Sequence, residues 1–256
     1  MYTFYDGGFF GYGEPGDFKY FSLAHIIPIV LLIVAIFFTY KYKDKLRNWK
    51  HEQSFRYVLS FLILFFEMAY YWRILYVGDE QGLNSMISKL PLQLCTWGAI
   101  CSIYMVITKN KLLFNYNFFV SIIYSTAALL FPSVISKCGP TYFRYYQYFF
   151  EHGLPIYATF YMMFVHGLKA EYKYIYIVTG IMLIHAFIAI RVNNTFPGTN
   201  FLYLQDASVQ SFQGDNPINY LPKNQYLRAL SLTGITLLLF NIEYFIYSKL
   251  TNRKKS

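Results

Sequence analysis

Residues 22–40 read SLAHIIPIVLLIVAIFFTY and contain no Lys, Arg, Asp or Glu. A helix rises by ~1.5 Å per residue and needs about 20 apolar residues to cross a hydrocarbon core. This stretch therefore predicts a membrane-spanning helix. The residues before it lack the basic start and continuous apolar core of a cleavable signal peptide, so we expect this first helix to be retained.

Similar apolar runs recur along the rest of the chain. Together they predict an all-α, polytopic membrane bundle of about seven helices, forming a single membrane domain over residues 1–256. The connection 191–226 is long and polar, and we expect it to form an ordered outer cap. The expected spans are roughly 22–40, 56–77, 91–107, 112–132, 146–167, 172–190 and 227–248.

Composition supports a membrane protein over other classes. Hydrophobic residues make up 56% of the chain and charged residues 14%, against about 25% charged in soluble domains. The formal charge of +9 comes from Lys and Arg scattered between apolar runs, which indicates topology signals and argues against a nucleic-acid-binding surface. The three cysteines are an odd number and suggest no disulfide framework.

The distribution of Lys and Arg predicts the orientation, because basic loops stay on the cytoplasmic side. With seven spans, fourteen basic residues fall on one side and six on the other. The N-terminus is therefore predicted outside and the C-terminus inside. The fourteen lie in segments 41–56, 108–111, 168–173 and after 248; the six are Lys19, Lys89, Lys137, Arg144, Arg191 and Lys223.

Polar residues within the spans are functional candidates, because they are costly in lipid. Most fall near the predicted outer ends of the helices, whereas the inner half offers chiefly Glu67, Asn241 and Glu243. This common depth predicts one shared outer-leaflet site. Its candidates are His25, Gln93, Cys95, Gln147, Glu151, His152 and His185, with Arg191 and Asn194 just past the sixth span.

Cys95 and His152 are the strongest pair among these candidates. If Pro91 opens the third helix, the Cys95 thiol lies one turn in, where unpaired N–H groups favour thiolate. Apolar burial opposes ionisation, so an imidazole such as His152 is needed as base. Pro155 predicts a kink beside His152. The alternative is that Cys95 is a small buried apolar residue.

The remaining polar groups allow several roles. Glu151 needs a cationic partner, either Arg73, Arg144, Arg191 or a histidine, and either orients the surroundings of His152 or joins two helices. His25, His185, His152 and Glu151 could ligate zinc, but no metal-binding spacing is present. We expect no metal and no other cofactor.

Three stretches carry a resemblance to a known family. They are LPLQLC from Leu90 to Cys95, RYYQYFFEHG from Arg144 to Gly153, and NNTFPGTNFLYL from Asn193 to Leu204. In order and position they resemble the YwaF-type bacterial integral membrane proteins, which are similar to eukaryotic transmembrane protein 164. The resemblance runs from about Phe21 to Tyr247.

This resemblance implies a lipid acyltransferase that uses a membrane-embedded cysteine and histidine, and Cys95 and His152 match those positions. In this interpretation Cys95 takes an acyl chain from a phospholipid as a thioester, and His152 deprotonates a lyso-lipid or other lipid-linked acceptor. From their depth, we predict His185, Gln93 and Asn200 as donors to the oxyanion. Membrane phospholipids are then the partners, and the sequence indicates no protein partner.

Other functions remain open at this stage. A small-solute or proton-coupled transporter would use the outer His and Glu residues as a relay, although the inner half has few polar groups. A binding or assembly subunit would use them only to join helices. A hydrolase would resolve the same thioester with water. The abundance of Asn, Lys, Ile, Tyr and Phe indicates an AT-rich bacterial genome, and hence the bacterial plasma membrane.

Overall fold

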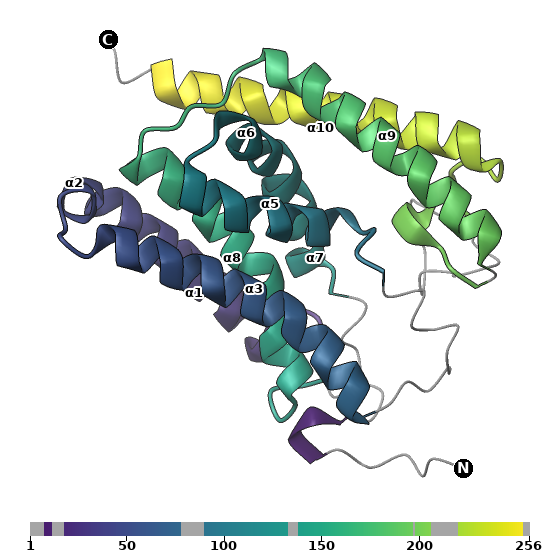
Figure 1. The fold of residues 1–256 in the computed structure, drawn as a ribbon, viewed down its shortest axis with the longest axis horizontal. Coiled ribbons are helices and arrows are strands. Elements are labelled where there is room, and N and C mark those ends of the chain that lie inside the picture. The colour runs from purple at the N-terminus through teal and green to yellow at the C-terminus, as the bar shows by residue number, and fades with distance from the viewer. Residues whose placement is uncertain are drawn as a thin grey trace. The chain divides into compact units, whose positions relative to one another are not determined.

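The computed structural model describes residues 8–11, 18–77, 90–132, 138–196, 198–205 and 220–252. These residues form helices and connecting turns, and none of them is in a strand (Figure 1). The longer helices are α1 (Leu23–Lys41), α3 (Glu52–Val77), α5 (Leu94–Thr108), α6 (Lys111–Val120), α8 (Phe143–Val165), α9 (Lys173–Thr195) and α10 (Gln225–Asn252). The shorter elements are η1 (Gly8–Phe10), α2 (Lys43–Arg47), the π-helical turn η2 (Ser121–Ser125), α7 (Thr126–Leu130) and the 3-10 turn η4 (Phe201–Tyr203).

Among the described residues, four helices are long and apolar enough to cross a membrane: α1, α9, α10, and the continuous run Lys111–Leu130 formed by α6, η2 and α7. The all-α membrane class is thus confirmed. Helix α5 is apolar but has only 15 residues, whereas α3 and α8 have 26 and 23 residues and carry charged side chains. Seven spans and the orientation of the termini stay predictions.

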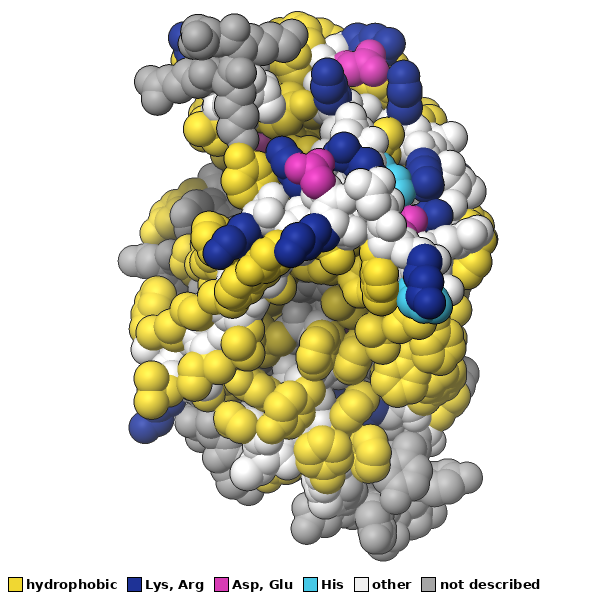
Figure 2. All heavy atoms as spheres, turned by 90° about the vertical axis from the view of Figure 1, so that its left-hand side faces the viewer, with side chains coloured by type: hydrophobic (Ala, Val, Ile, Leu, Met, Phe, Trp, Pro, Cys, Tyr) yellow, Lys and Arg dark blue, Asp and Glu magenta, His cyan; other side chains and the backbone are white. Residues whose placement is uncertain are grey.

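The surface of these helices supports the membrane assignment. Only 11% of the apolar window of α1 is buried, and Leu23, Leu31 and Phe37 on it are more than half exposed. Figure 2 shows one face on which Lys and Arg gather above a broad hydrophobic surface. An apolar surface of this extent is unfavourable in water, so lipid is the medium that suits it.

The chain divides into two compact units. Unit 1 comprises Met1–Gly82 and Leu94–Lys169, and unit 2 comprises Leu83–Gln93 and Ala170–Ser256. The single domain expected from the sequence stays a prediction. Of the expected outer cap 191–226, residues 197 and 206–219 lie outside the described residues.

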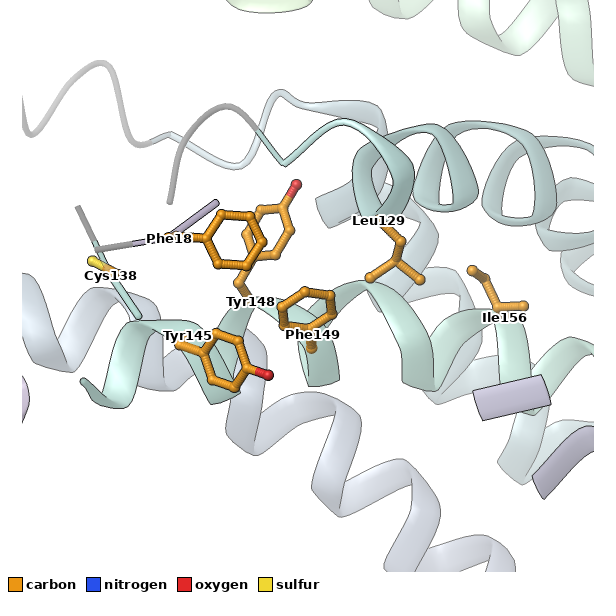
Figure 3. Packing of buried hydrophobic residues seen from close by; sticks show 7 residues of the cluster. All are labelled: Phe18, Leu129, Cys138, Tyr145, Tyr148, Phe149 and Ile156. Carbon is orange, nitrogen blue, oxygen red and sulfur yellow. The ribbon is translucent and has the colours of Figure 1, made fainter. Parts of the chain in front are cut away.

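Helix α8 is central to unit 1, where it packs against α1, α3, α5 and η2. One side of it carries Tyr145, Tyr148 and Phe149, which lie with Phe18 and Leu129 in a buried cluster (Figure 3). The Tyr145 hydroxyl donates to the Ala24 carbonyl at 2.6 Å, and the Tyr148 hydroxyl to the Ala128 carbonyl at 2.7 Å. These rings fill space while their hydroxyls are satisfied, so α8 is fixed against α1 and α7.

Local sequence explains where two helices of unit 1 begin and end. The Asn110 side chain accepts the backbone N–H groups of Leu112 and Leu113, which caps the start of α6. Gly167 follows the end of α8 with a φ of 68°, a left-handed conformation that glycine adopts without strain. These signals mark where α6 begins and where α8 ends.

Unit 2 is built on α9 and α10, which lie side by side (Figure 1). Its small apolar core joins α9 to η4 and α10, through Ala186, Ala189, Ile190, Phe201, Leu204 and Ala229. The turn η4 therefore packs against the membrane helices of its own unit.

Candidate active site

The Cys95 thiol lies in the first turn of its helix. Helix α5 begins at Leu94, so Cys95 is its second residue, where backbone N–H groups have no intrahelical acceptor. The prediction that Pro91 opens this helix is wrong. The Leu92 N–H donates to the Leu90 carbonyl at 2.7 Å in a tight turn, and the helix begins only after it.

Ser125 forms a hydrogen bond with this thiol, and the carboxyls of Glu67 and Glu151 are near enough to interact with it electrostatically. Ser125 is the last residue of the π-helical turn η2 and is 1% exposed. Its Oγ has no oxygen or nitrogen partner among the described residues and lies next to the thiol. Turns of π-helix occur often at functional sites. A buried hydroxyl whose only hydrogen bond among the described residues goes to a thiol, a weak acceptor, is a candidate for contact with a ligand.

Glu67 is a further candidate, which the sequence analysis placed among the few polar groups of the inner half of the membrane. It is 5% exposed, and it accepts a hydrogen bond from the hydroxyl of Thr96, the residue after Cys95. Its Oε2 has no hydrogen-bond partner within the described part of the chain. Because α3 begins at Glu52, Glu67 lies beyond the middle of this helix and reaches the first turn of α5.

Glu151 lies in a hydrogen-bonded network along α8. Its Oε2 accepts from Arg144 Nη1 at 3.0 Å and from Gln147 Nε2 at 2.7 Å. The Gln147 Oε1 also accepts from Arg144, and its Nε2 donates to the Phe66 carbonyl at 2.8 Å. Of the four possible partners for Glu151, the structure shows Arg144. The network fixes α8 to α3.

We call the set Glu67, Cys95, Thr96, Ser125, Arg144, Gln147 and Glu151 the Cys95 cluster. It is contained within unit 1. The Arg144 guanidinium also stacks over the Tyr70 ring, 4.5 Å from its centroid. The cluster thus combines a firmly held ion pair with two side chains, Glu67 and Ser125, that retain hydrogen-bonding capacity.

His152 is 7% exposed and lies against the Tyr148 ring, with the ring centroids 4.4 Å apart. Its Nδ1 is 2.9 Å from the Tyr148 carbonyl oxygen. Because a carbonyl only accepts, Nδ1 carries the proton, and Nε2 of the neutral ring is the basic nitrogen. Within the described residues Nε2 makes no hydrogen bond, and neither a hydrogen bond nor a charge contact joins His152 to Cys95. Helix α5, which carries Cys95, packs against α8, which carries His152. The pairing of these two side chains stays a prediction.

His25 differs from His152 because both its ring nitrogens are used. Nδ1 accepts the Phe21 N–H at 3.0 Å, so Nε2 carries the proton and donates to the Leu129 carbonyl at 2.8 Å. The ring is 1% exposed. His25 therefore joins α1 to the end of α7 and has no nitrogen left for chemistry.

In unit 2, the predicted supporting residues organise a loop. Gln93 Oε1 accepts the Leu202 N–H at 3.4 Å, and Asn200 Oδ1 accepts the Gln205 N–H at 2.9 Å. His185 is hydrogen-bonded to the backbone of Leu92. The side chains of Arg191 and Asn194 are exposed.

Asn193, which the sequence did not single out, holds this loop together. Its side chain accepts the Phe201 N–H at 2.8 Å and donates to the Phe201 carbonyl at 3.1 Å. It follows Ala186, Ala189 and Ile190 on the buried face of α9, at helical spacing. That spacing is the signal that distinguishes Asn193 from the exposed Asn194.

The ten predicted site residues are divided equally between the units. Cys95, His25, Gln147, Glu151 and His152 belong to unit 1, and Gln93, His185, Arg191, Asn194 and Asn200 to unit 2. The chain passes from unit 2 into unit 1 between Gln93 and Leu94. A single site that contains all ten stays a prediction.

A second buried polar cluster lies near the other end of α3 and α8, and we call it the Glu52 cluster. Glu52 Oε1 accepts from Arg56 Nε at 3.0 Å, from the Tyr161 hydroxyl at 3.1 Å and from His166 Nε2 at 2.7 Å. Arg56 also donates to the carbonyls of Val106 and Ile107, which lie in the last turn of α5. Here none of the described buried side-chain atoms lacks a partner.

Potential metal ligands do not gather in the described part of the chain: no three His, Cys, Asp or Glu side chains form a suitable group there. The functional groups of the Cys95 cluster are a thiol, two hydroxyls, two carboxyls, an amide and a guanidinium.

Comparison with known proteins identifies the family. The TMEM164 family model matches residues 20–244, and this range covers most of both units and all the candidate site residues. No match was found among curated proteins or among solved structures. Together with the apolar helices, the match shows a multi-pass membrane protein. The chain belongs to the TMEM164 family.

Proposed function

We propose that the protein is a membrane acyltransferase that moves a fatty acyl chain from a phospholipid, through a Cys95 thioester, to a lyso-lipid or other lipid-linked acceptor. One observation carries the proposal: the Cys95 thiol lies at a helix start, hydrogen-bonded to the buried Ser125 hydroxyl, and the next residue, Thr96, is bonded to the buried Glu67, whose Oε2 has no partner among the described residues. A cysteine that only fills space does not require such neighbours, which are costly to bury unpaired.

The reaction has two balanced steps. In the first, the Cys95 sulfur forms a bond to the ester carbonyl carbon, the carbon–oxygen ester bond breaks, and the leaving lyso-lipid oxygen takes the thiol proton. In the second, the acceptor hydroxyl attacks the thioester, and its proton returns to the departing sulfur. His152 Nε2 carries the proton in both steps, because Nδ1 is occupied by the Tyr148 carbonyl.

The membrane arrangement that suits this reaction has seven spans, with the N-terminus outside and the C-terminus inside, in a bacterial plasma membrane. Helices α3, α5 and α8 then cross together with the four apolar helices. Basic residues at the Glu52 end of unit 1 support this orientation, because Lys and Arg are retained on the cytoplasmic side. The Cys95 cluster then lies in the outer leaflet, near the level of phospholipid ester bonds.

The proposal is tested by acyl transfer in vesicles. Purified protein is reconstituted with phosphatidylcholine that carries a deuterated acyl chain and with a lyso-phospholipid of a different headgroup, and the products are identified by mass spectrometry. We expect labelled diacyl product with the wild type and with Cys101→Ala, but none with Cys95→Ala. Cys101 is a matched control, because it is a partly exposed thiol on the same helix.

Transfer that persists in Cys95→Ala would contradict the proposal. Labelled free fatty acid in place of diacyl product would indicate that water resolves the thioester, and hence a hydrolase.

A small-solute or proton-coupled transporter is the second candidate, and it is favoured by the buried Glu67 carboxyl beside the Arg144–Glu151 pair. Intramembrane carboxyls of this kind occur in proton relays. Proton uptake by proteoliposomes, followed with an enclosed pH-sensitive dye, tests this function. Uptake that is lost in Glu67→Gln and kept in Cys95→Ala would support the transporter.

A further inference from the structure

The side chains beside Cys95 suggest a role that the thiol and His152 do not fill. When sulfur attacks an ester, the carbonyl oxygen gains a negative charge that must be stabilised where the thiol lies. The sequence predicted donors in Gln93, His185 and Asn200, all of which belong to unit 2. In unit 1, Ser125 forms a hydrogen bond with the thiol, and Glu67 is hydrogen-bonded to Thr96, the residue after Cys95.

We propose that Ser125 and Glu67 form the oxyanion site of the reaction, each donating a hydrogen bond to the carbonyl oxygen of the ester or thioester at Cys95. This inference rests on the proposed acyl-transfer function. Ser125 Oγ is 1% exposed, and among the described residues its only hydrogen bond goes to the Cys95 sulfur, a weak acceptor, so this proton can turn to the carbonyl oxygen once the sulfur attacks. The free N–H groups of the first turn of α5 add positive potential at the same place.

Glu67 can donate only as a neutral acid. The charges around it favour that form. The only guanidinium of the Cys95 cluster, that of Arg144, is paired with Glu151 at 3.0 Å. A second carboxylate in this buried site would lack a cation of its own, whereas a protonated Glu67 leaves the cluster neutral. Thr96 donates to Glu67, and the unpaired Oε2 is the atom that carries the proton towards a ligand.

The test compares two reactions of the same thiol. Acylation of Cys95 by p-nitrophenyl octanoate passes through a tetrahedral oxyanion and releases p-nitrophenolate. Alkylation of Cys95 by iodoacetamide forms a carbon–sulfur bond and releases iodide without an oxyanion. Both reactions need thiolate, so the ratio of their rates cancels changes in thiolate fraction and access. Each rate is measured in detergent micelles by mass spectrometry of the Cys95 peptide.

We expect Ser125→Ala to lower the acylation-to-alkylation ratio by about 100-fold, the effect of removing one oxyanion donor. Glu67→Leu should lower it to a similar extent. Glu67→Gln should keep it within about threefold, because the amide still donates. Ser102→Ala is the matched control, since this buried hydroxyl donates to Asn117 at 3.0 Å, and we expect no change.

An unchanged ratio in both Ser125→Ala and Glu67→Leu would overturn the inference. So would a loss in Glu67→Gln equal to that in Glu67→Leu, because that result requires a carboxylate acting as base. The soluble ester bypasses the phospholipid. Absence of phospholipid transfer together with the expected ratios would therefore contradict the proposed function and leave the oxyanion site standing.

Discussion

Unit 1 contains two buried polar clusters on the same helices, α3 and α8, and they differ in how completely they are satisfied. In the Glu52 cluster one carboxylate oxygen receives hydrogen bonds from Arg56, Tyr161 and His166. In the Cys95 cluster, Glu67 Oε2 has no partner among the described residues, and Ser125 Oγ has none there besides the Cys95 sulfur. Both clusters are costly to bury, so we infer that the first stabilises the fold and propose that the second accepts a ligand.

The largest expected effect separates two buried histidines. His152→Ala should lower acyl transfer about 100-fold or more, because it removes a general base, and should cost less stability than His25→Ala, because it breaks one ring hydrogen bond instead of two. His25→Ala should keep transfer in the folded fraction but lose about 1–3 kcal/mol of stability, since both its nitrogens are bonded. Vesicle transfer assays and thermal unfolding in detergent measure both variants. If both variants lost the same amount of acyl transfer per folded molecule, His152 and His25 could not be assigned different roles.

The two glutamates give the next largest contrast. Glu52→Ala leaves Arg56 buried without its carboxylate and should cost about 3 kcal/mol in the free energy of unfolding. Glu67→Gln removes no ion pair and should change it by less than about 1 kcal/mol. Thermal melts followed by Trp fluorescence test this. A Glu67→Gln variant as unstable as Glu52→Ala would show that the Cys95 cluster is structural.

Gly98→Ala tests whether the position of η2 matters to the Cys95 cluster. A Cβ at Gly98 would lie 2.7 Å from Ser121 Oγ, which donates to Asn117 at 2.7 Å. The clash should displace the turn that carries Ser125, cost about 1–3 kcal/mol and lower transfer more than stability alone explains. Gly234→Ala is the control, because a Cβ added at Gly234 would meet, among the described residues, no atom within 4 Å beyond its chain neighbours and its own helix backbone. Equal transfer rates in these two variants would count against a role for η2.

Acidification should give the smallest effect, and it should act on the Glu52 cluster. Burial opposes ionisation of Glu52, but hydrogen bonds from His166 and Arg56 outweigh it and hold the pKa of this carboxyl below its ordinary value. The stability that the carboxylate contributes is therefore complete above about pH 4.3 and is lost as the pH falls through the lowered pKa. Melting temperatures between pH 7 and 3.5 should fall only at the acid end. The fall should be smaller in Glu52→Gln; an equal fall would assign it to other groups.

The fold could largely be predicted from the sequence, because long apolar runs determine where helices lie. The expected runs all fall on described helices, with the ends displaced. Helix α3 begins at Glu52, before the expected position 56, since tertiary hydrogen bonds to Tyr161 and His166 make its first turn favourable. Apolar periodicity does not include such contacts.

The site could be predicted only in part. Cys95 and Glu151 stood out as polar groups in apolar runs, but Ser125 did not, since a π turn changes the direction of its side chains relative to 3.6-residue spacing. His25 was selected by depth alone, and the sequence cannot show that both its nitrogens are bonded. Hydrogen-bond satisfaction is a tertiary property, and it is the property that separates the two clusters.

The most direct measurement is the intact mass of the protein after incubation with phosphatidylcholine vesicles without an acceptor, with and without hydroxylamine. We predict one acyl adduct on the wild type, cleaved by hydroxylamine, absent from Cys95→Ala and retained in Cys101→Ala. An unmodified wild type, or the same adduct on Cys95→Ala, would contradict the assignment of the Cys95 cluster as a site of acyl transfer.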